Sequence, residues 1–323
     1  MTGSKRLGAR SEPKASEEDG LGARSEPEAS VVRTRWLVTG AAGQLGRSVV
    51  EAAAELGIEA VGRSRAELDV GDPDAVAHAL DELRPDVVLN TAAFTAVDRC
   101  EDERQAAERA NAWAPGVLAR GCRGAATLLH ISTDYVFPGS AHRPIPEDSP
   151  TEPLCAYGRT KWQGEQAVRD SGCEHLIVRV QWLFGPGANF VRTIQRAAQR
   201  GEDLRVVEDQ LGRPTSTRAL APRLVHAVQR GLRGTLHLGC EGIASWFDFA
   251  REIVAEGAAR GHHPKVGVVP VPSEAVPRPA RRPAYAVLDL ARARAAGLAL
   301  PHWRDALRVH LDTRDSERGA DNA

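Results

Sequence analysis

The sequence lacks several features that would assign a protein to a common class. It has no run of 18 apolar residues and no Cys or His pair with metal-site spacing, which argues against a membrane-spanning helix and against a zinc site. The 42 Lys and Arg nearly balance the 43 Asp and Glu, so we expect neither a nucleic acid nor a membrane as partner. The five cysteines are scattered, and no apolar segment follows the basic N-terminus. We therefore expect reduced thiols, no signal peptide and a cytoplasmic protein.

The two ends of the chain differ in composition from the rest. LGARSEPKAS at 7–16 recurs almost unchanged as LGARSEPEAS at 21–30. These repeats carry too little apolar surface to offset the entropy of ordering them, so residues 1–33 are expected to be a disordered tail. Three explanations of this tail remain open: a docking segment, a linker, or translation from an upstream start codon. A second polar tail is expected at 313–323.

Between the tails, short apolar runs alternate with helical patterns. The strands predicted in this way cover residues 36–39, 58–61, 87–89, 126–131 and 176–180. The predicted helices end at 56 or cover 75–83, 101–120 and 157–169. This alternation favours an α/β fold with a doubly wound parallel sheet at 34–185. Beyond residue 185 the predicted elements are shorter and are interrupted by Pro, Gly and Arg. We therefore expect 186–312 to form mostly a smaller lobe, although some of its strands could pair with the parallel sheet.

A glycine-rich loop follows the first predicted strand and opens the first helix. Its glycines, at the spacing G-x-x-G-x-x-G, are Gly40, Gly43 and Gly46. Glycines allow a tight turn and let backbone N–H groups approach a pyrophosphate at the positive end of a helix. Because the loop lies in a regular β-α-β unit, we interpret 34–185 as a Rossmann domain that binds NAD(P).

The end of the second strand indicates which dinucleotide is bound. It carries Arg63 and Arg65 and no acidic residue that could hold a ribose 2′-hydroxyl. Arginine pairs with a 2′-phosphate, so the sequence favours NADPH, with NADH as the alternative.

A tyrosine and a lysine four residues apart suggest acid–base chemistry. Tyr157 and Lys161 share one face of a predicted helix, and an ammonium there would draw the tyrosine pKa down from about 10. Thr133 ends the fourth strand, at the sheet edge where ligands of such folds bind. Its hydroxyl could donate to the substrate oxygen that Tyr157 protonates.

With these residues in place, the chain resembles the dTDP-4-dehydrorhamnose reductases of the extended short-chain dehydrogenase/reductases. The resemblance covers roughly residues 34–312. The matching stretches, in family order, are VTGAAGQLG (38–46), ELDVGD (67–72), PDVVLNTAAFTAVDRCE (85–101), ISTDYVFPG (131–139), YGRTKWQGE (157–165), RVQWLFG (179–185), DQLGRPTS (209–216) and RPAYAVLD (282–289).

The resemblance implies a role for each matching position. The cofactor would be held by Gly40, Gly43, Gln44, Leu45 and Gly46 at the pyrophosphate, Asp69 and Val70 at the adenine, and Ala93, Phe94 and Thr95 beside the nicotinamide ribose. Tyr157 would donate the proton, Lys161 would hold the nicotinamide ribose, and Thr133 would polarise the carbonyl. Asp134, Tyr135 and Trp182 would contact the sugar. The resemblance implies a dTDP-linked 4-keto-6-deoxy sugar as substrate, and reduction of dTDP-4-dehydrorhamnose to dTDP-L-rhamnose.

One departure from the family at position 48 and three alternatives limit this interpretation. Some members hold magnesium in a dimer interface through a glutamate where this chain has Ser48, so magnesium is not expected and a homodimer stays open. A sister enzyme that reduces another dTDP-deoxysugar for antibiotic biosynthesis would carry the same motifs. Dehydratases on this scaffold need a pair of acidic residues after the threonine. Here Asp134 is followed by Tyr135, so a dehydratase fits poorly. A regulatory subunit of methionine adenosyltransferase also resembles the family, but such a subunit could lose the catalytic residues that are present here.

Overall fold

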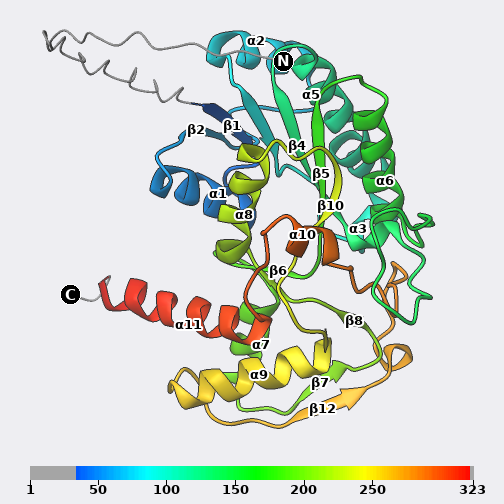
Figure 1. The fold of residues 1–323 in the computed structure, drawn as a ribbon. Helices are drawn as coiled ribbons and strands as arrows, with labels where there is room; N and C mark the ends of the chain where they lie inside the picture. Colours follow the sequence, from blue (N-terminus) through cyan, green and yellow to red (C-terminus); the bar gives the residue numbers. More distant parts are fainter. Residues whose placement is uncertain (1–33, 321–323) are drawn as a thin grey trace, which may run out of the picture. The chain divides into compact units, whose positions relative to one another are not determined.

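The computed structural model describes residues 34–320, with side chains described as far as Thr313. The repeats expected to form the tail at 1–33 lie outside the described residues. The described part is built on a sheet of six parallel strands (Figure 1). In spatial order these are β10 (Gly234–His237), β5 (His175–Val180), β4 (Thr127–Thr133), β3 (Val87–Asn90), β1 (Arg35–Thr39) and β2 (Glu59–Arg63). The strand order reverses between β1 and β3, since β2 is added on one side of β1 and β3 on the other, and such a switch point is where dinucleotides bind in this fold.

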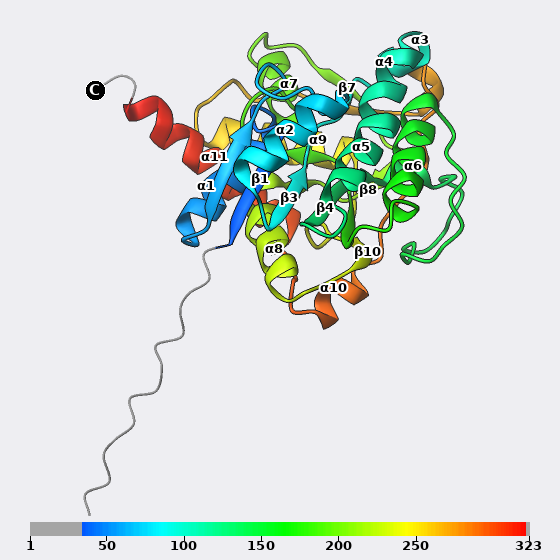
Figure 2. The ribbon, with the colours of Figure 1, turned by 90° about the horizontal axis from the view of Figure 1, so that it is seen from above.

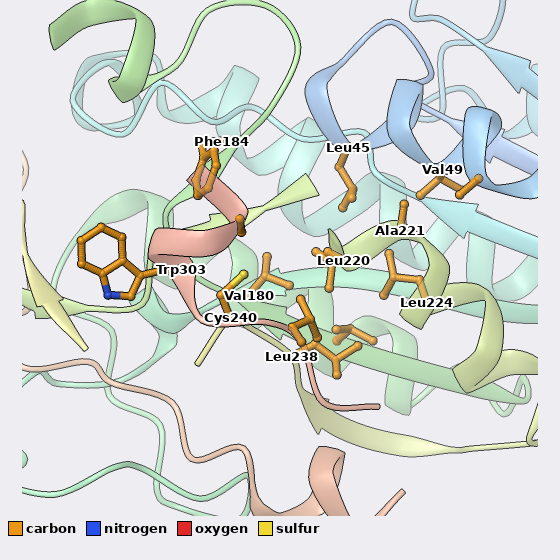
Figure 3. Packing of buried hydrophobic residues seen from close by; sticks show 14 of the residues in the cluster. Leu45, Val49, Val180, Phe184, Leu220, Ala221, Leu224, Leu238, Cys240 and Trp303 are labelled. Carbon is orange, nitrogen blue, oxygen red and sulfur yellow. The ribbon is translucent and has the colours of Figure 1, made fainter. Parts of the chain in front are cut away.

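Helices cover both faces of the sheet, as the apolar strands predict. They are α1 (Gln44–Glu55), α2 (Pro73–Leu83), α5 (Ala114–Cys122), α6 (Ala156–Arg169) and α8 (Thr217–Gln229). Because side chains alternate along a strand, Val38 packs toward α1 and α8 while Leu37 packs toward α2 and α5. Figure 2 shows α5 and α6 side by side, and Figure 3 shows Leu45 and Val49 of α1 near Leu220 of α8. The doubly wound α/β fold is thus confirmed.

The helix predicted over 101–120 is interrupted in the structure. It consists of α3 (Arg99–Asp102), α4 (Arg104–Glu108), a π-helical turn (Arg109–Trp113) and α5. Pro115 explains the π turn, because it has no N–H to bond the Asn111 carbonyl four residues earlier. That carbonyl faces α6 at Gly164, where an added Cβ would lie only 2.1 Å from the oxygen. The prediction of one continuous helix was therefore wrong.

The second half of the chain extends the sheet and also forms a layer beside it. β10 pairs with β5, and α8 covers the sheet, so the return of strands that the sequence left open is observed. The remaining elements are β6 (Leu183–Phe184), α7 (Phe190–Ala198), β7 (Leu204–Val207), β8 (Leu211–Gly212), β9 (Thr215–Ser216), β11 (Ala244–Ser245), α9 (Trp246–Ala259), β12 (Val268–Val271), α10 (Ala291–Ala295) and α11 (Trp303–Ala320), with short 3-10 turns at Asp134–Val136 and Ser273–Ala275. β7 and β12 form a separate parallel pair.

The C-terminal helix α11 continues beyond Asp312, where the sequence predicted a polar tail. Leu311 is the last buried apolar residue of this helix whose side chain is described. Adding turns to an existing helix costs little, so a polar segment can remain helical without further burial. Residues 321–323 lie outside the described residues. No helix within 34–320 is long and apolar enough to cross a membrane.

Candidate functional site

A pocket of about 680 Å³ lies at the carboxyl edge of the sheet. Its walls come from the ends of β1, β3, β4 and β5 and from the start of α9. All but one of the residues predicted for cofactor, catalysis and substrate line it: Gly40, Gly43, Gln44, Leu45, Gly46, Asp69, Val70, Ala93, Phe94, Thr95, Thr133, Asp134, Tyr135, Tyr157, Lys161 and Trp182. Arg63 is the exception. Residues as far apart in the sequence as Gly40 and Trp182 therefore share one cavity.

The glycine loop has the geometry needed for a close-lying phosphate. Gly40 has φ +69°, and a Cβ there would lie 2.7 Å from the Ala92 nitrogen. A Cβ at Gly46 would lie 2.5 Å from the Gly40 carbonyl oxygen. Helix α1 has Gly43 as its N-cap with no side-chain cap, and the buried Gln44 Oε1 has no hydrogen-bond partner. The first turn of α1 thus offers backbone N–H groups to an anion, which fits a dinucleotide pyrophosphate.

The adenine side of the pocket corrects one prediction and adds a residue. Arg65 lines the pocket, whereas Arg63 does not, because it is the last residue of β2 and its carbonyl accepts from Ala41 N. Asp69 accepts from Arg109 Nη2 at 2.7 Å and from Gly71 N at 2.9 Å. The Arg109 guanidinium holds the pKa of Asp69 below its ordinary value. Arg109 lies on the π turn, 40 residues from Asp69 in the sequence, so residue spacing could not have revealed this ion pair.

The loop at Ala93–Thr95 is held in place by Asn111, which the sequence reasoning missed. Asn111 Oδ1 accepts from Phe94 N at 2.8 Å, and its Nδ2 donates to the Phe94 carbonyl at 3.0 Å. Nδ2 also contacts Thr160 Oγ1 on α6 at 3.2 Å. One buried amide therefore fixes this wall of the pocket against the helix that carries Tyr157.

Tyr157 and Lys161 are both buried on α6, at 9% and 3% exposure. Burial raises the pKa of Tyr157 above its ordinary value. A hydrogen bond with Thr133 lowers this pKa, but only partly offsets the effect of burial. Lys161 Nζ donates to the Ile131 carbonyl at 2.7 Å, and burial lowers its pKa to about 8 while Glu165 opposes the change. Desolvation is the main influence on the pKa of Tyr157 in this structure, so the lowering expected from Lys161 stays a prediction.

Lys161 is followed one helical turn later by a buried ion pair. Glu165 is fully buried and accepts two bonds from Arg179 of β5, at 2.9 and 2.8 Å. Arg169 donates to the same carboxylate at 2.8 Å. This pairing holds the pKa of Glu165 low despite its burial, since the arginines stabilise its charge. It also ties the helix of Tyr157 to the central sheet.

Thr133 and Asp134 lie together at the end of β4. Thr133 Oγ1 is 3.0 Å from Asp134 Oδ1, and Asp134 Oδ2 accepts from Gln181 Nε2 at 3.1 Å. The carboxyl group is 2% exposed, and burial raises its pKa to about 6. Both of its oxygens are therefore occupied by protein groups.

Aromatic residues line the far side of the pocket. The rings of Trp182 and Trp246 stack at 3.6 Å with 12° between their planes. Trp182 has φ +41°, and a Cβ at Gly212 would lie 2.6 Å from its indole, so its conformation depends on that glycine. Tyr135 packs edge-on against Tyr157, with centroids 5.3 Å apart. Trp246 was not predicted, because only the fold brings the start of α9 to this edge.

Ser48, where some family members have a glutamate, faces its own chain. It is 4% exposed, and its hydroxyl lies 2.8 Å from Thr217 Oγ1 at the start of α8. This contact joins two helices of the same face of the sheet.

Comparisons with known proteins agree with this geometry. The model of the RmlD substrate binding domain family matches residues 34–315. A Streptomyces antibioticus protein described as a probable dTDP-4,6-dihydroxy-2-methyloxan-3-one 4-ketoreductase is 47% identical, over 85% of this chain and 93% of its own length. A Burkholderia thailandensis dTDP-4-dehydrorhamnose reductase is 41% identical, over 86% of this chain and 98% of its own.

A solved structure shows the same fold with a cofactor bound. The dTDP-4-dehydrorhamnose reductase of Bacillus anthracis in complex with NADP superimposes with a TM-score of 0.82. It is 33% identical and covers 87% of this chain and 99% of its own. With the family model spanning nearly all the described residues, the chain belongs to the dTDP-4-dehydrorhamnose reductase family of extended short-chain dehydrogenases/reductases.

Proposed function

We propose that the protein reduces the 4-keto group of a dTDP-linked 4-keto-6-deoxyhexose with NAD(P)H, converting dTDP-4-dehydrorhamnose to dTDP-L-rhamnose. The observation that carries the proposal is the gathering of Thr133, Tyr157 and Lys161 in the pocket that also contains the glycine loop. The names of the relatives support the substrate class, and the NADP complex supports the cofactor.

The cofactor would be held by the chain's own groups. The first turn of α1 would bind the pyrophosphate, Asp69 and Val70 would flank the adenine, and Lys161 would hold the nicotinamide ribose. When bound, the reduced nicotinamide supplies the hydride. The pocket that lies between β1 and β3 also contains the end of β4 and the first turn of α6, so a nicotinamide held there would lie near the acid–base residues.

Tyr157 would donate the proton to the keto oxygen. Its raised pKa keeps the phenol protonated at neutral pH, which is the form required of a donor. Lys161 would stabilise the phenolate left behind, because only four residues separate the two on one helical face. The stacked Trp182 and Trp246 would form an apolar wall against the sugar.

A second candidate is a 4-ketoreductase for another dTDP-deoxysugar of antibiotic biosynthesis. The Streptomyces antibioticus relative, at 47% identity, favours it. The two candidates share Thr133, Tyr157 and Lys161 and would differ where residues 186–312, proposed here as mostly the substrate lobe, meet the sugar. Trp246 is the residue of that region that lines the pocket.

The test is to incubate the purified protein with NADPH and a panel of dTDP-4-keto-deoxysugars. The products would be identified by mass spectrometry and by NMR of the C4 configuration. Formation of dTDP-L-rhamnose supports the first candidate, and another dTDP-deoxysugar supports the second. Binding of the sugars without NADPH oxidation would contradict both.

The proposal also covers the cellular location and the oligomeric state of the protein. A cytoplasmic location fits an enzyme that draws on NADPH and nucleotide sugars, and cell fractionation would test it. A homodimer, if formed, would have to assemble without a glutamate at position 48, since Ser48 bonds within its own chain. Sedimentation with and without magnesium would test both the assembly and its metal dependence.

A further inference from the structure

The Thr133 hydroxyl has one proton, and both the Asp134 carboxyl and the Tyr157 oxygen are close enough to accept it. Thr133 Oγ1 donates to Asp134 Oδ1 at 3.0 Å and accepts from Tyr135 N at 3.2 Å. An ionised carboxylate only accepts hydrogen bonds. While Asp134 is ionised, it therefore competes with the Tyr157 oxygen and with a keto oxygen in the pocket for the single Thr133 proton.

Gln181 determines which oxygen of Asp134 can carry a proton. Gln181 Oε1 accepts from Leu288 N at 3.2 Å, and its Nε2 donates to the Ala286 carbonyl. The amide is thus oriented by two backbone groups, and its Nε2 must face Asp134 Oδ2, at 3.1 Å. Because Oδ2 accepts a hydrogen bond from Gln181, a neutral Asp134 would carry its own proton on Oδ1, which faces Thr133.

The surroundings of Asp134 make both of its protonation states accessible. Burial raises its pKa to about 6, while the bonds from Gln181 and Thr133 lower it. The titratable groups that face it are the phenols of Tyr135, from its own turn, and Tyr157, from α6. No Lys, Arg or His among residues 34–313 forms an ion pair with it that would hold it ionised. The segment around Ala286 is linked to it by hydrogen bonds through Gln181.

We propose that Asp134 is a positioning residue, whose protonated carboxyl donates to Thr133 Oγ1 and so turns the Thr133 proton into the pocket, toward the keto oxygen that Tyr157 protonates. This inference rests on the proposed function. In the neutral state Thr133 Oγ1 accepts from Asp134 Oδ1 and Tyr135 N and donates to the substrate. All of its hydrogen-bonding capacity is then used.

The sign of the pH effect follows from this arrangement. The productive state has Asp134 protonated, so it is populated below the pKa of Asp134 and lost as pH rises through that value. Between pH 5 and pH 8 the protonated fraction of a group with a pKa near 6 falls on the order of 10²-fold. Lys161, with a pKa of about 8, titrates at the upper end of the same range.

The variant Asp134→Asn separates the titration of Asp134 from that of Lys161. Its amide nitrogen would donate to Thr133 at every pH, while its oxygen would accept from Gln181 Nε2, so it mimics the protonated carboxyl. We expect the ratio of its kcat to that of the wild type to rise on the order of 10²-fold from pH 5 to pH 8, whatever the ratio is at pH 5. Lys161 and Tyr157 titrate in both proteins and cancel in the ratio.

The matched control removes the hydroxyl through which Asp134 acts. The ratio of Thr133→Val/Asp134→Asn to Thr133→Val should be flat over the same pH range. A ratio of Asp134→Asn to wild type that does not change with pH would overturn the proposal. So would an equal rise in the absence of the Thr133 hydroxyl.

A spectroscopic measurement covers the case in which Asp134→Asn does not fold. The infrared C=O band of the protonated carboxyl in the wild type should disappear with the same midpoint as the fall in kcat. Thr133→Val should remove that limb of the kcat profile while the band still titrates. Different midpoints would contradict the proposal. If the wild type reduces none of the dTDP-4-keto sugars at any pH, the proposed function fails instead.

Discussion

Replacing Arg65 with alanine should reduce the preference of this enzyme for NADPH over NADH. Arg65 lines the adenine end of the pocket and is exposed, so its guanidinium is free to reach a 2′-phosphate. A charge-assisted hydrogen bond is worth about 1.5–3 kcal/mol, and exposure to solvent places this one near the lower limit. Since 1.4 kcal/mol corresponds to a factor of ten, we expect NADPH KM to rise about tenfold.

The expected change is confined to one kinetic constant and one cofactor. The 2′-phosphate is remote from the hydride, so its contacts contribute equally in the ground and transition states and kcat should stay nearly constant. NADH, which lacks this phosphate, should be used as before. Arg109 remains beside Asp69 at 2.7 Å and would keep part of the positive charge in place, which limits the loss. Steady-state kinetics with both cofactors measures this directly.

Arg63→Ala is the matched control. Arg63 lies two residues away at the end of β2 but does not line the pocket, so its removal should leave both KM values unchanged. Equal losses in the two variants would show that the arginines act only through overall charge. A wild type that uses NADH and NADPH equally well would refute the assignment of Arg65.

Three further predictions concern catalysis, the N-terminus and packing. Tyr157→Phe should lower kcat by about 10² or more and leave the NADPH dissociation constant, measured by fluorescence, nearly unchanged; a variant with most of its activity would exclude Tyr157 as the proton donor. A chain beginning at Thr34 should match the full-length protein in Tm and turnover, since the pocket is built from later residues; a Tm lower by several degrees would show that the repeats contribute contacts. Gly164→Ala should lower the free energy of unfolding by about 1–3 kcal/mol, because the added Cβ would lie 2.1 Å from the Asn111 carbonyl oxygen. In Gly116→Ala the added Cβ would meet only side-chain atoms, at 3.1 and 3.2 Å, so this variant should be nearly as stable as the wild type. Denaturant melts of the two alanine variants would compare them, and equal stability would contradict the contact.

The sequence predicted those features that depend on local pattern. Five of the six sheet strands, the glycine loop and the pairing of Tyr157 with Lys161 follow from periodicity and spacing of neighbouring residues. The prediction of a single helix over 101–120 failed because Pro115 acts on a carbonyl that only the fold places against α6.

The rest of the site depends on contacts between distant residues. Asn111, Gln181 and Trp246 have no local signal that points to the pocket. Gln181 and Trp246 line it directly, and Asn111 acts on it through the hydrogen bonds to Phe94. The electrostatics of Tyr157 also escaped prediction. Spacing places Lys161 on its face of the helix but does not reveal that the lysine donates to the Ile131 carbonyl, nor how deeply the phenol is buried.

The position of β10 affects how the protein can be made on the ribosome. β10 pairs with β5 through Gly234–His237, more than 50 residues after β5 has been synthesised. Until then, the HLIVRV segment of β5 forms an unprotected edge whose N–H and C=O groups can pair with another nascent chain. The first five strands already contain the glycine loop, Thr133 and the helix of Tyr157, yet a fragment ending at β5 would carry an open apolar edge and be prone to aggregate. Translation must continue through α8 and β10 before β5 is paired on both sides, so this apolar strand is covered only when the second half of the chain has arrived.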